Sequence, residues 1–283
     1  MLVSVIVPVY NDRLRLELCL TALQSQTYSN FEILVVDNNS TENIYSVCEK
    51  FPNVCYLFEP TPGNNAARNC GIQYAAGEVI AITDSDCVPD VDWLKQGAKV
   101  FGTHPEVGLM GGHIQFFFKG KKPTVAEYVD SICYLQQETY ITRDHYAAGA
   151  NLLVRRKVFE QVGGFDDRLM NLGDKEFGQR VYESGWLLAY VADAIVFHPA
   201  RPHLKALLTK LRRQIRAQHK LSALTGTQLP RCSFLPYGVR FFRNVWNDRN
   251  LPGWREKLTF AWIMHWMKWI AAWELSITRP KHQ

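Results

Sequence analysis

The sequence predicts an α/β protein whose central sheet is open and mostly parallel, and three patterns indicate this fold class. Short apolar runs rich in β-branched residues alternate with stretches of helical spacing, as strands and their crossover helices do. The first run, residues 2–9, is apolar almost throughout, which is typical of a parallel strand covered on both faces. Polar side chains directly follow three of the runs, and parallel sheets bind ligands beyond the carboxyl ends of their strands.

Four strands and three helices are expected in the first third of the chain. In the first helix, Leu14, Leu18 and Ala22 recur at helical spacing. We expect the strands at residues 2–9, 31–37, 53–59 and 78–84, and the helices between them at 13–26, 41–51 and 64–77.

The following hundred residues contain further strands and one long helix. A strand is expected at residues 107–118, then a basic turn at 119–123, and a strand with small central residues at 145–156. Another short strand is expected before the segment 194–202. A helix is expected at 124–141, whose inward-facing residues would be Val125, Val129, Ile132 and Leu135.

Composition and charge indicate a packed body with a different tail. Hydrophobic residues make up 47% of the chain and aromatic residues 12%, which argues for a globular protein rather than a disordered one. Residues 1–200 carry 16 Lys and Arg against 24 Asp and Glu, whereas residues 201–283 carry 16 against 3. An acidic body followed by a basic, Trp-rich tail predicts two parts with two functions.

The cysteines and the first residues indicate a cytoplasmic protein. The seven cysteines are odd in number and form no CxxC pair, so we expect reduced thiols and no zinc site. The opening segment MLVSVIVPVY has no basic leader and is typical of a first strand rather than of a signal peptide.

Clustered carboxylates follow the fourth expected strand, in the segment ITDSDCVPD. No Walker A or GxGxxG pattern follows the first strand, so a nucleotide diphosphate here would need a divalent metal held by a carboxylate. Asp86 is a candidate for that carboxylate, and Asp84 is a candidate for a ribose contact. The alternative is a turn whose Asp side chains bond to backbone amides, a role that suits Asp90.

Six segments, taken in order, resemble family 2 glycosyltransferases of the GT-A fold. The segments are VSVIVPVYN, ILVVDNNS, ARNCGI, AITDSDC, GGFDD and GDKEFGQRV, and the resemblance covers about residues 2–216. It implies a GT-A catalytic domain at 1–200, with a nucleotide-sugar half at about 1–105 and an acceptor half at about 106–200. It also implies that Asp86, in the central Asp-x-Asp motif, binds a Mn²⁺ or Mg²⁺ ion that bridges the diphosphate of a nucleotide sugar.

The resemblance further implies which residues contact the nucleotide. Pro8 and Tyr10 would flank the base, and Asp37 would bond a uracil-type edge. Arg68 would lie near the nucleotide and Asp84 near the ribose. Each residue also has a structural alternative. Pro8 suits a strand end and Tyr10 a rim position, whereas Asp37 suits a helix cap and Arg68 a helix surface.

The resemblance assigns the general base to the segment GDKEFGQRV. Asp174 matches the family's catalytic carboxylate, and Glu176 matches a second acidic position with acceptor or structural contacts. Many family members have Glu immediately before the catalytic Asp, whereas this chain has Gly173. The alternative for Asp174 is a helix cap.

Three further residues are candidates for contacts around the reacting groups. Asn151, in the small-residue strand, is a candidate lining residue for the acceptor. His198 would be a second metal ligand, because imidazole suits Mn²⁺, or it would bond the backbone near Pro199. Arg201 would pair with the diphosphate or with an anionic acceptor, as a guanidinium fork does.

The C-terminal extension, residues 201–283, is expected to be helical and basic. Trp262, Trp266, Trp269 and Trp273 share one helix face, and the run that contains them is too short and too polar to span a bilayer. Tryptophan favours the headgroup region and basic residues favour anionic lipid, so an anionic membrane surface is one expected partner. The alternative is a helix that packs on the catalytic domain. No nucleic-acid recognition motif accompanies the charge, so nucleic acid is not an expected partner.

These patterns favour one activity over two alternatives. The favoured activity is metal-dependent, inverting transfer of a sugar from a nucleotide-diphosphate donor, a UDP-sugar, to a hydroxyl of a polysaccharide or lipid-linked acceptor. A location on the inner face of the membrane suits the tail. One alternative is an inactive sugar-nucleotide-binding scaffold at the membrane, which Gly173 favours. The other is a nucleotidyltransferase, which would need a Gly-rich basic loop after the first strand that VYNDRLRLE does not supply.

Overall fold

The computed structural model describes residues 1–226, 229, 234–235, 237–248, 251 and 253–277. Its contacts form two compact units. Unit 1 comprises Met1–Phe117 and Leu135–Pro199, and unit 2 comprises Phe118–Tyr134 and Ala200–Gln283. Residues 118–134 and Ala200, which the sequence analysis assigns to the catalytic domain, group in this division with the C-terminal part of the chain.

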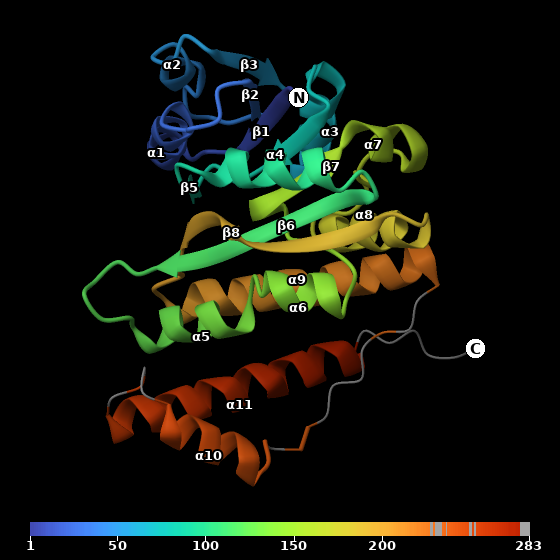
Figure 1. Ribbon diagram of the computed structural model, residues 1–283. Coiled ribbons are helices and arrows are strands. Elements are labelled where there is room, and N and C mark those ends of the chain that lie inside the picture. Colours follow the sequence, from blue (N-terminus) through green and yellow to red (C-terminus); the bar gives the residue numbers. More distant parts are fainter. Residues whose placement is uncertain (227–228, 230–233, 236, 249–250, 252, 278–283) are drawn as a thin grey trace. The chain divides into compact units, whose positions relative to one another are not determined.

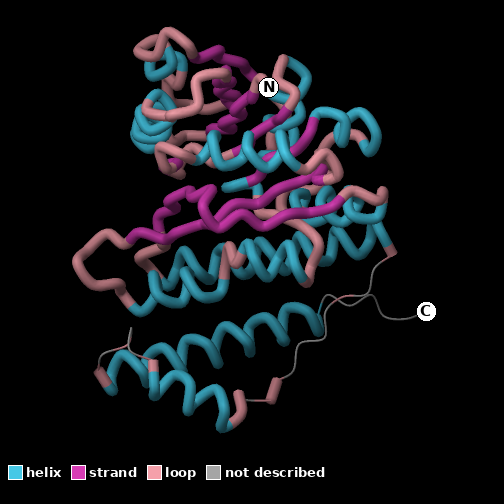
Figure 2. Tube along the Cα trace, in the orientation of Figure 1, coloured by secondary structure: helices cyan, strands magenta, loops and turns pink. Residues whose placement is uncertain are grey.

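Unit 1 contains one eight-stranded sheet with the order β3-β2-β1-β4-β7-β6-β8-β5. The strands β1 to β4 run parallel to one another, as predicted, whereas β7 is antiparallel to both of its neighbours, β4 and β6. The long strands β6 and β8 lie side by side and parallel (Figures 1 and 2). The strands are β1 Val3–Val9, β2 Phe31–Asp37, β3 Val54–Phe58, β4 Val79–Ile82, β5 Val88–Pro89, β6 Val107–Phe117, β7 Leu152–Arg155 and β8 Leu187–Pro199.

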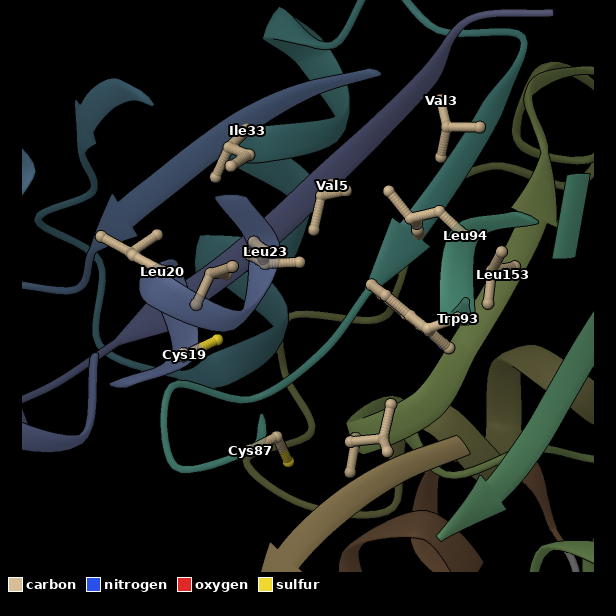
Figure 3. Close-up of a cluster of buried hydrophobic side chains, with 14 of the residues drawn as sticks. Val3, Val5, Cys19, Leu20, Leu23, Ile33, Cys87, Trp93, Leu94 and Leu153 are labelled. Atoms are coloured by element: carbon tan, nitrogen blue, oxygen red, sulfur yellow. The ribbon is translucent and has the colours of Figure 1, made fainter. Parts of the chain in front are cut away.

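Helices cover both faces of this sheet and bury its apolar side chains. On β1, Val3 and Val5 belong to one core cluster, and Ile6 belongs to the other, as alternation along a strand requires. Figure 3 shows the first cluster, where Leu20 and Leu23 of α1 lie near Val5 and Ile33 of the sheet, and Trp93 and Leu94 of α4 lie near Leu153. The helices of unit 1 are α1 Arg13–Gln24, α2 Tyr45–Cys48, α3 Asn64–Tyr74, α4 Trp93–Thr103, α6 Gln137–Thr142, α7 Arg156–Val162 and α8 Gly173–Glu183, with the 3₁₀ turn η1 at Gly149–Asn151.

The helix α1 forms as predicted, but the leucines whose spacing predicted it, Leu14 and Leu18, lie on its exposed face. Leu14 and Leu18 are 79% and 60% exposed. The buried face carries Leu16, Leu20 and Leu23 instead. Because leucines occupy every second position from 14 to 20, two stripes fit helical spacing equally well, and packing on the sheet selects one of them.

The long helix expected at 124–141 is two helices. The helix α5, Val125–Cys133, begins with a capping box between Thr124 and Glu127, and α6 begins at Gln137. Leu135, between them, has a left-handed backbone with φ of 55°, which no helix continues through. Ile132 is therefore exposed rather than inward-facing, whereas Val129 is buried.

Two of the predicted strands differ from the prediction in length. The strand expected at 145–156 is reduced to the four residues of β7, because Gly149 to Asn151 form the turn η1. The short strand expected before residue 194 is instead the start of β8, which continues to Pro199. The turn η1 places the backbone of Gly149 close to the Arg68 guanidinium.

Unit 2 is helical in its described residues and contains a buried ion cluster. The carboxylate of Asp130, on α5, is fully buried and lies 3.0 Å from the Arg201 guanidinium and 3.5 Å from Lys210 Nζ. The Lys210 ammonium also lies 3.9 Å from the centre of the Tyr134 ring. Burial lowers the pKa of Lys210 to about 8, and Arg201 acts in the same direction. The remaining helices are α9 Leu204–Thr225, α10 Val239–Asn247 and α11 Trp254–Ile277.

The helix α11 buries one face and exposes its tryptophans on another. Phe260, Ile263 and Met267 are buried within unit 2. The exposed fractions of Trp262, Trp269 and Trp273 are 59%, 55% and 62%, and Trp266, stacked on Trp262, is also partly exposed. Within the described residues, no helix combines the length and the apolar character needed to cross a bilayer.

Candidate active site

The carboxyl ends of β1, β2 and β4 form one edge of the sheet. Parallel pairing aligns Val9 of β1 with Asp37 of β2, and Ile6 of β1 with Ile82, the last residue of β4. The loops after these strands therefore emerge together. They carry the polar groups that the sequence predicts at strand ends.

The predicted base-contacting residues lie at this edge. Pro8 is buried near the end of β1, whereas Tyr10 is exposed directly after it. The Asp37 carboxylate is nearly buried and accepts hydrogen bonds from the Ser40 amide and the Tyr56 hydroxyl, both at 2.9 Å. These bonds orient the carboxylate and leave lone pairs on its oxygens for a further donor.

A second group of side chains gathers after β4 and at the end of β8. Ligand atoms of Asp84, Asp86, Cys87 and His198 all lie within 4.8 Å of one another. His198 is nearly buried, and its Nδ1 lies 2.8 Å from the carbonyl oxygen of Pro199. With Nδ1 protonated and donating to that carbonyl, Nε2 presents its lone pair toward Asp86 Oδ1, 3.9 Å away. His198 can therefore bond the Pro199 carbonyl through Nδ1 and offer Nε2 to a metal ion at the same time.

The chemistry of this donor set fits Mn²⁺ or Mg²⁺. Two carboxylates and a neutral imidazole are suitable ligands for such a hard cation or for one of borderline hardness. The Cys87 thiol is fully buried, and burial raises its pKa well above the ordinary value, with the carboxylates of Asp86 and Asp84 adding to the effect. Cys87 is therefore a neutral thiol beside the carboxylates.

Negative charge accumulates at Asp86. Burial raises the pKa of its carboxyl group, and the neighbouring Asp84 and Asp12 carboxylates raise it further. His198 and Arg15 act in the opposite direction without cancelling the rise. A divalent cation would relieve this repulsion, which gives the carboxylate cluster after β4 a physical reason to exist.

A pocket of about 140 Å³ opens beside the cluster. Its polar wall includes Arg68, whose side chain is nearly buried and whose Nη2 lies 3.3 Å from Asp84 Oδ1. The Nε of Arg68 is buried and has no hydrogen-bond partner among the residues that the structure describes. The pocket is lined by Asn64, Asn65, Arg68, Asp84, Leu135, Ala148, Gly149, Ala150, Met170, Asn171, Leu172, Gly173 and Asp174.

Asp174 lies on the wall of this pocket, in the first turn of α8. Its Oδ2 accepts a 3.3 Å hydrogen bond from the Gly149 amide, and its Oδ1 accepts a 2.9 Å bond from the Lys175 amide. Burial raises its pKa, while Arg68 and the two amide bonds oppose the rise. The helix cap is Leu172, so Asp174 does not occupy the capping position.

The glycine before Asp174 has a structural reason. A Cβ at Gly173 would lie 1.9 Å from the Nδ2 atom of Asn65. Asn65 is buried and donates hydrogen bonds to the carbonyl oxygens of Asp166 and Leu169, at 2.9 and 2.7 Å. The Asn65 side chain thus occupies the space into which a side chain at position 173 would extend.

Three of the predicted contact residues lie outside the pocket. The Asn151 side chain is fully buried, accepts a bond from Trp93 Nε1 at 2.8 Å, and donates to two backbone carbonyls. Glu176 pairs with Arg180 one turn along α8, at 2.8 Å. Arg201 belongs to unit 2, where its guanidinium pairs with Asp130. Each of the three has a structural role within the described residues.

Sequence reasoning missed two charged residues that reach the cluster. Arg15, on α1, pairs with Asp12 through Nε at 2.7 Å and with Asp86 through Nη1 at 3.4 Å. The spacing of Asp12 and Arg15, three residues apart at a helix start, is a signal for the first pair. The second pair joins residues 71 positions apart, so no local pattern could have indicated it.

A match to a family model decides the identity of this strand-end site. The model described as Glycosyl transferase family 2 matches residues 4–163, which is more than half of the chain. The chain belongs to this family. It is 38% identical over 218 residues to Glycosyltransferase AglE of Haloferax volcanii, a match that covers 74% of this chain and 71% of the relative. It is also 24% identical to the chondroitin synthase of Escherichia coli, over 70% of this chain and 35% of that enzyme.

Solved glycosyltransferase structures share the fold. The mannosyltransferase PcManGT from Pyrobaculum calidifontis, in complex with GDP-Man and Mn²⁺, has a TM-score of 0.63 and 19% identity, over 97% of this chain and 72% of that one. Residues 1–349 of S. aureus TarS with UDP-GlcNAc give a TM-score of 0.57 at 20% identity, over 77% of this chain and 66% of that one. The GT-A fold class predicted from the sequence is thus confirmed, and this family 2 glycosyltransferase is an enzyme.

Proposed function

We propose that this glycosyltransferase moves a sugar from a UDP-sugar donor to an acceptor hydroxyl by a metal-dependent, inverting displacement. One observation carries the proposal. Asp174, with its raised pKa, shares a pocket with Arg68 and Asp84, and the Asp86–His198 cluster lies beside that pocket. A base, a cation and a metal-ligand set within one site are the parts that glycosyl transfer from a diphosphate needs.

The strand-end residues would bind the nucleotide. Tyr10 is exposed and free to stack on the base, and Pro8 precedes it at the strand end. Asp37 has lone pairs for an N–H donor on the base edge, and Asp84 would accept from a ribose hydroxyl. Because guanine also presents N–H donors, GDP is the competing nucleotide in any binding experiment. The complexes of PcManGT with GDP-Man and TarS with UDP-GlcNAc make both comparisons relevant.

Asp86 and His198 would hold Mn²⁺ or Mg²⁺, with Asp84 nearby. The cation, when bound, supplies positive charge that stabilises the diphosphate as it leaves. The presence of Mn²⁺ in the PcManGT complex supports this assignment. Arg68 would add a fixed guanidinium on the pocket side, where its buried Nε has a donor to offer.

Asp174 would accept the proton of the attacking hydroxyl. The raised pKa of its carboxylate favours proton transfer, and the amides of Gly149 and Lys175 hold it in position. Attack from the face opposite the diphosphate inverts the anomeric centre in one step. No covalent intermediate, and hence no nucleophilic side chain, is required.

The acceptor would be a polysaccharide or lipid-linked glycan at an anionic membrane surface on the cytoplasmic side. The exposed stripe of Trp262, Trp269 and Trp273 on α11 supports this assignment. Tryptophan side chains favour the headgroup region, and the excess of basic residues in 201–283 favours anionic lipid. Peripheral binding by unit 2 would bring the enzyme to an acceptor anchored in the bilayer.

The inactive-scaffold alternative loses its main support in this geometry. It was favoured by Gly173, but Asn65 fills the corresponding space, and Asp174 remains in the pocket. The decisive experiment incubates the protein with a panel of UDP- and GDP-sugars and Mn²⁺ and measures the release of free nucleoside diphosphate. We expect release from at least one UDP-sugar, and its stimulation by a glycan acceptor. Binding of UDP without turnover of any donor would support the scaffold.

A further inference from the structure

Arg15, on α1, contacts one carboxylate in the loop after β1 and one of the predicted metal ligands. Its Nε lies 2.7 Å from Asp12 Oδ1, and its Nη1 lies 3.4 Å from Asp86 Oδ2. The side chain is 52% exposed, so the guanidinium faces both the carboxylates and solvent. It opposes the accumulation of negative charge at Asp86.

The two contacts of the guanidinium differ in quality. The Asp12 contact is a short, charge-assisted hydrogen bond, and Asp12 is itself held by the Ser85 hydroxyl at 3.3 Å. The Asp86 contact, at 3.4 Å, is long for such a bond. Arg15 is therefore anchored through one edge, while the other edge is loosely held and free to take a better acceptor.

A metal ion bound by Asp84, Asp86 and His198 would change the hydrogen-bond partner of Arg15 Nη1. The Asp86 oxygens would turn to the cation, so they would attract the guanidinium less. A diphosphate bound together with such a cation would bring phosphate oxygens near this cluster, and a guanidinium fork can bond phosphate oxygens in the same bidentate way as a carboxylate.

We propose that Arg15 is an exchangeable cation of the donor site, which neutralises Asp86 before the metal binds and then donates to the diphosphate. The inference rests on the proposed function, since it assumes the metal and the diphosphate at this edge. It predicts opposite effects of one substitution. Removing the charge of Arg15 should strengthen binding of the metal alone and weaken binding of the metal–diphosphate pair.

The experiment compares Arg15→Gln with Arg13→Gln, which removes the same charge from an exposed position two residues earlier on α1. Calorimetric titration with Mn²⁺ alone should show binding about 2- to 5-fold tighter for Arg15→Gln, as expected for loss of a partly exposed competing charge. With saturating Mn²⁺, UDP should bind roughly 10-fold more weakly, because a charge-assisted hydrogen bond is lost. Uridine should bind Arg15→Gln and wild type equally, which localises the loss to the phosphates.

A third variant separates charge from shape. Arg15→Lys keeps the charge, so its affinity for Mn²⁺ should match wild type, whereas UDP affinity should fall between wild type and Arg15→Gln. Thermal unfolding of all variants should be unchanged, since the side chain is half exposed. If wild type binds Mn²⁺ and UDP, and Arg15→Gln behaves as Arg13→Gln does, the proposed role of Arg15 is refuted and the proposed function is not affected. If wild type binds neither, the proposed function fails with it.

Discussion

Gly149 and Arg68 are in direct contact, and a Cβ on Gly149 would lie 2.1 Å from Arg68 Nη2. The same glycine donates its amide to Asp174, so one residue of η1 fixes both the guanidinium and the carboxylate of the pocket. Arg68 in turn lies 3.3 Å from Asp84. The relative positions of the predicted base and the predicted nucleotide contact thus depend on the absence of a side chain at position 149.

Gly149→Ala is expected to separate activity from stability. The added methyl group must displace the guanidinium, which is the far end of a flexible side chain, so overpacking should cost no more than about 1–3 kcal/mol of unfolding free energy. Turnover should fall at least roughly 10-fold, because Arg68 leaves Asp84 and the pocket. Gly102→Ala is the matched control, since a Cβ there meets no atom within 4 Å. Wild-type turnover in Gly149→Ala would show that the position of Arg68 is unimportant.

Asp174→Asn is expected to retain UDP binding and to lose transfer. Loss of a general base should lower turnover by at least ~10²-fold, and rapid quenching of a single turnover would locate the loss in the chemical step. Asparagine preserves the shape and one acceptor for the Gly149 amide. Turnover within a few-fold of wild type would exclude Asp174 as the base.

The raised pKa of Asp174 predicts a pH dependence with a definite sign. Because the folded-state pKa lies above the unfolded value, ionisation of this carboxylate opposes folding at neutral pH. Asp174→Asn should therefore be at least as stable as wild type at pH 7. The difference should begin to shrink as the pH falls through the raised folded-state pKa and should vanish below the lower pKa of the unfolded state. Thermal unfolding across this pH range measures it, and a variant less stable than wild type at pH 7 would contradict the prediction.

Two aspartates of the segment after β4, Asp86 and Asp90, should respond differently to substitution. Asp86→Ala is expected to abolish turnover and the dependence of UDP binding on Mn²⁺, because it removes the central member of the ligand cluster. Asp90→Ala should leave both intact, since within the described residues of unit 1 the Asp90 carboxylate accepts its hydrogen bond from the nearby Asp92 amide and lies outside the ligand cluster. Thermal-shift titration with UDP, with and without a chelator, checks both. Equal binding of UDP to wild type in chelator would refute the metal role of Asp86.

Much of the fold followed from local patterns in the sequence, and part of it could not. The parallel strands β1, β2 and β4 were predictable because each is a largely buried run with β-branched residues, and β3 because its short apolar run follows a helical segment. The insertion of β7 between β4 and β6 was not, since strand order depends on packing across the whole sheet. The break at Leu135 was missed because a leucine in a left-handed conformation has no signature in the sequence.

The candidate site divides in the same way. The positions of Asp37, Asp84 and Asp86 at the ends of predicted strands indicated that they lie at one edge of the sheet, because the carboxyl ends of parallel strands lie together. Arg15 was missed because its contact with Asp86 joins distant parts of the chain. Arg201 was predicted to pair with the diphosphate or with an anionic acceptor. In the structure its guanidinium pairs with Asp130 in unit 2, because a buried carboxylate needs a cation, and the sequence does not indicate where a carboxylate is buried.

Asp130→Asn is expected to destabilise the protein without affecting the donor site. It leaves the cations of Arg201 and Lys210 without their shared carboxylate, and breaking a buried ion pair costs about 3–5 kcal/mol. Chemical denaturation measures the loss, and UDP affinity at a temperature where the variant is folded should match wild type. Asp193→Asn, at an exposed position, is the control. Weaker UDP binding by Arg201→Gln at full stability would instead restore the predicted diphosphate contact.

Replacing the exposed tryptophans of α11 tests the membrane proposal without removing the helix. Truncation at residue 254 would uncover the partners of Phe260, Ile263 and Met267, so a loss of binding could reflect unfolding. The triple variant Trp262→Ser, Trp269→Ser, Trp273→Ser changes only the exposed stripe, and its thermal unfolding should match wild type. Each apolar side chain that enters the bilayer interface is worth up to about 1.5–3 kcal/mol, so binding to vesicles with anionic lipid should weaken at least roughly 10-fold.

Varying the ionic strength and the lipid charge tests the contribution of the basic residues to membrane binding. Binding of the wild type should weaken as ionic strength rises, because each basic residue near the surface contributes about 1 kcal/mol that is screened within a Debye length. Vesicles of neutral lipid should bind less protein than anionic ones at low salt. Co-sedimentation of both proteins with both vesicles gives the four values. Equal binding of the triple variant and wild type would leave the basic residues as the only membrane contact, and absence of wild-type binding at low salt would refute the membrane proposal.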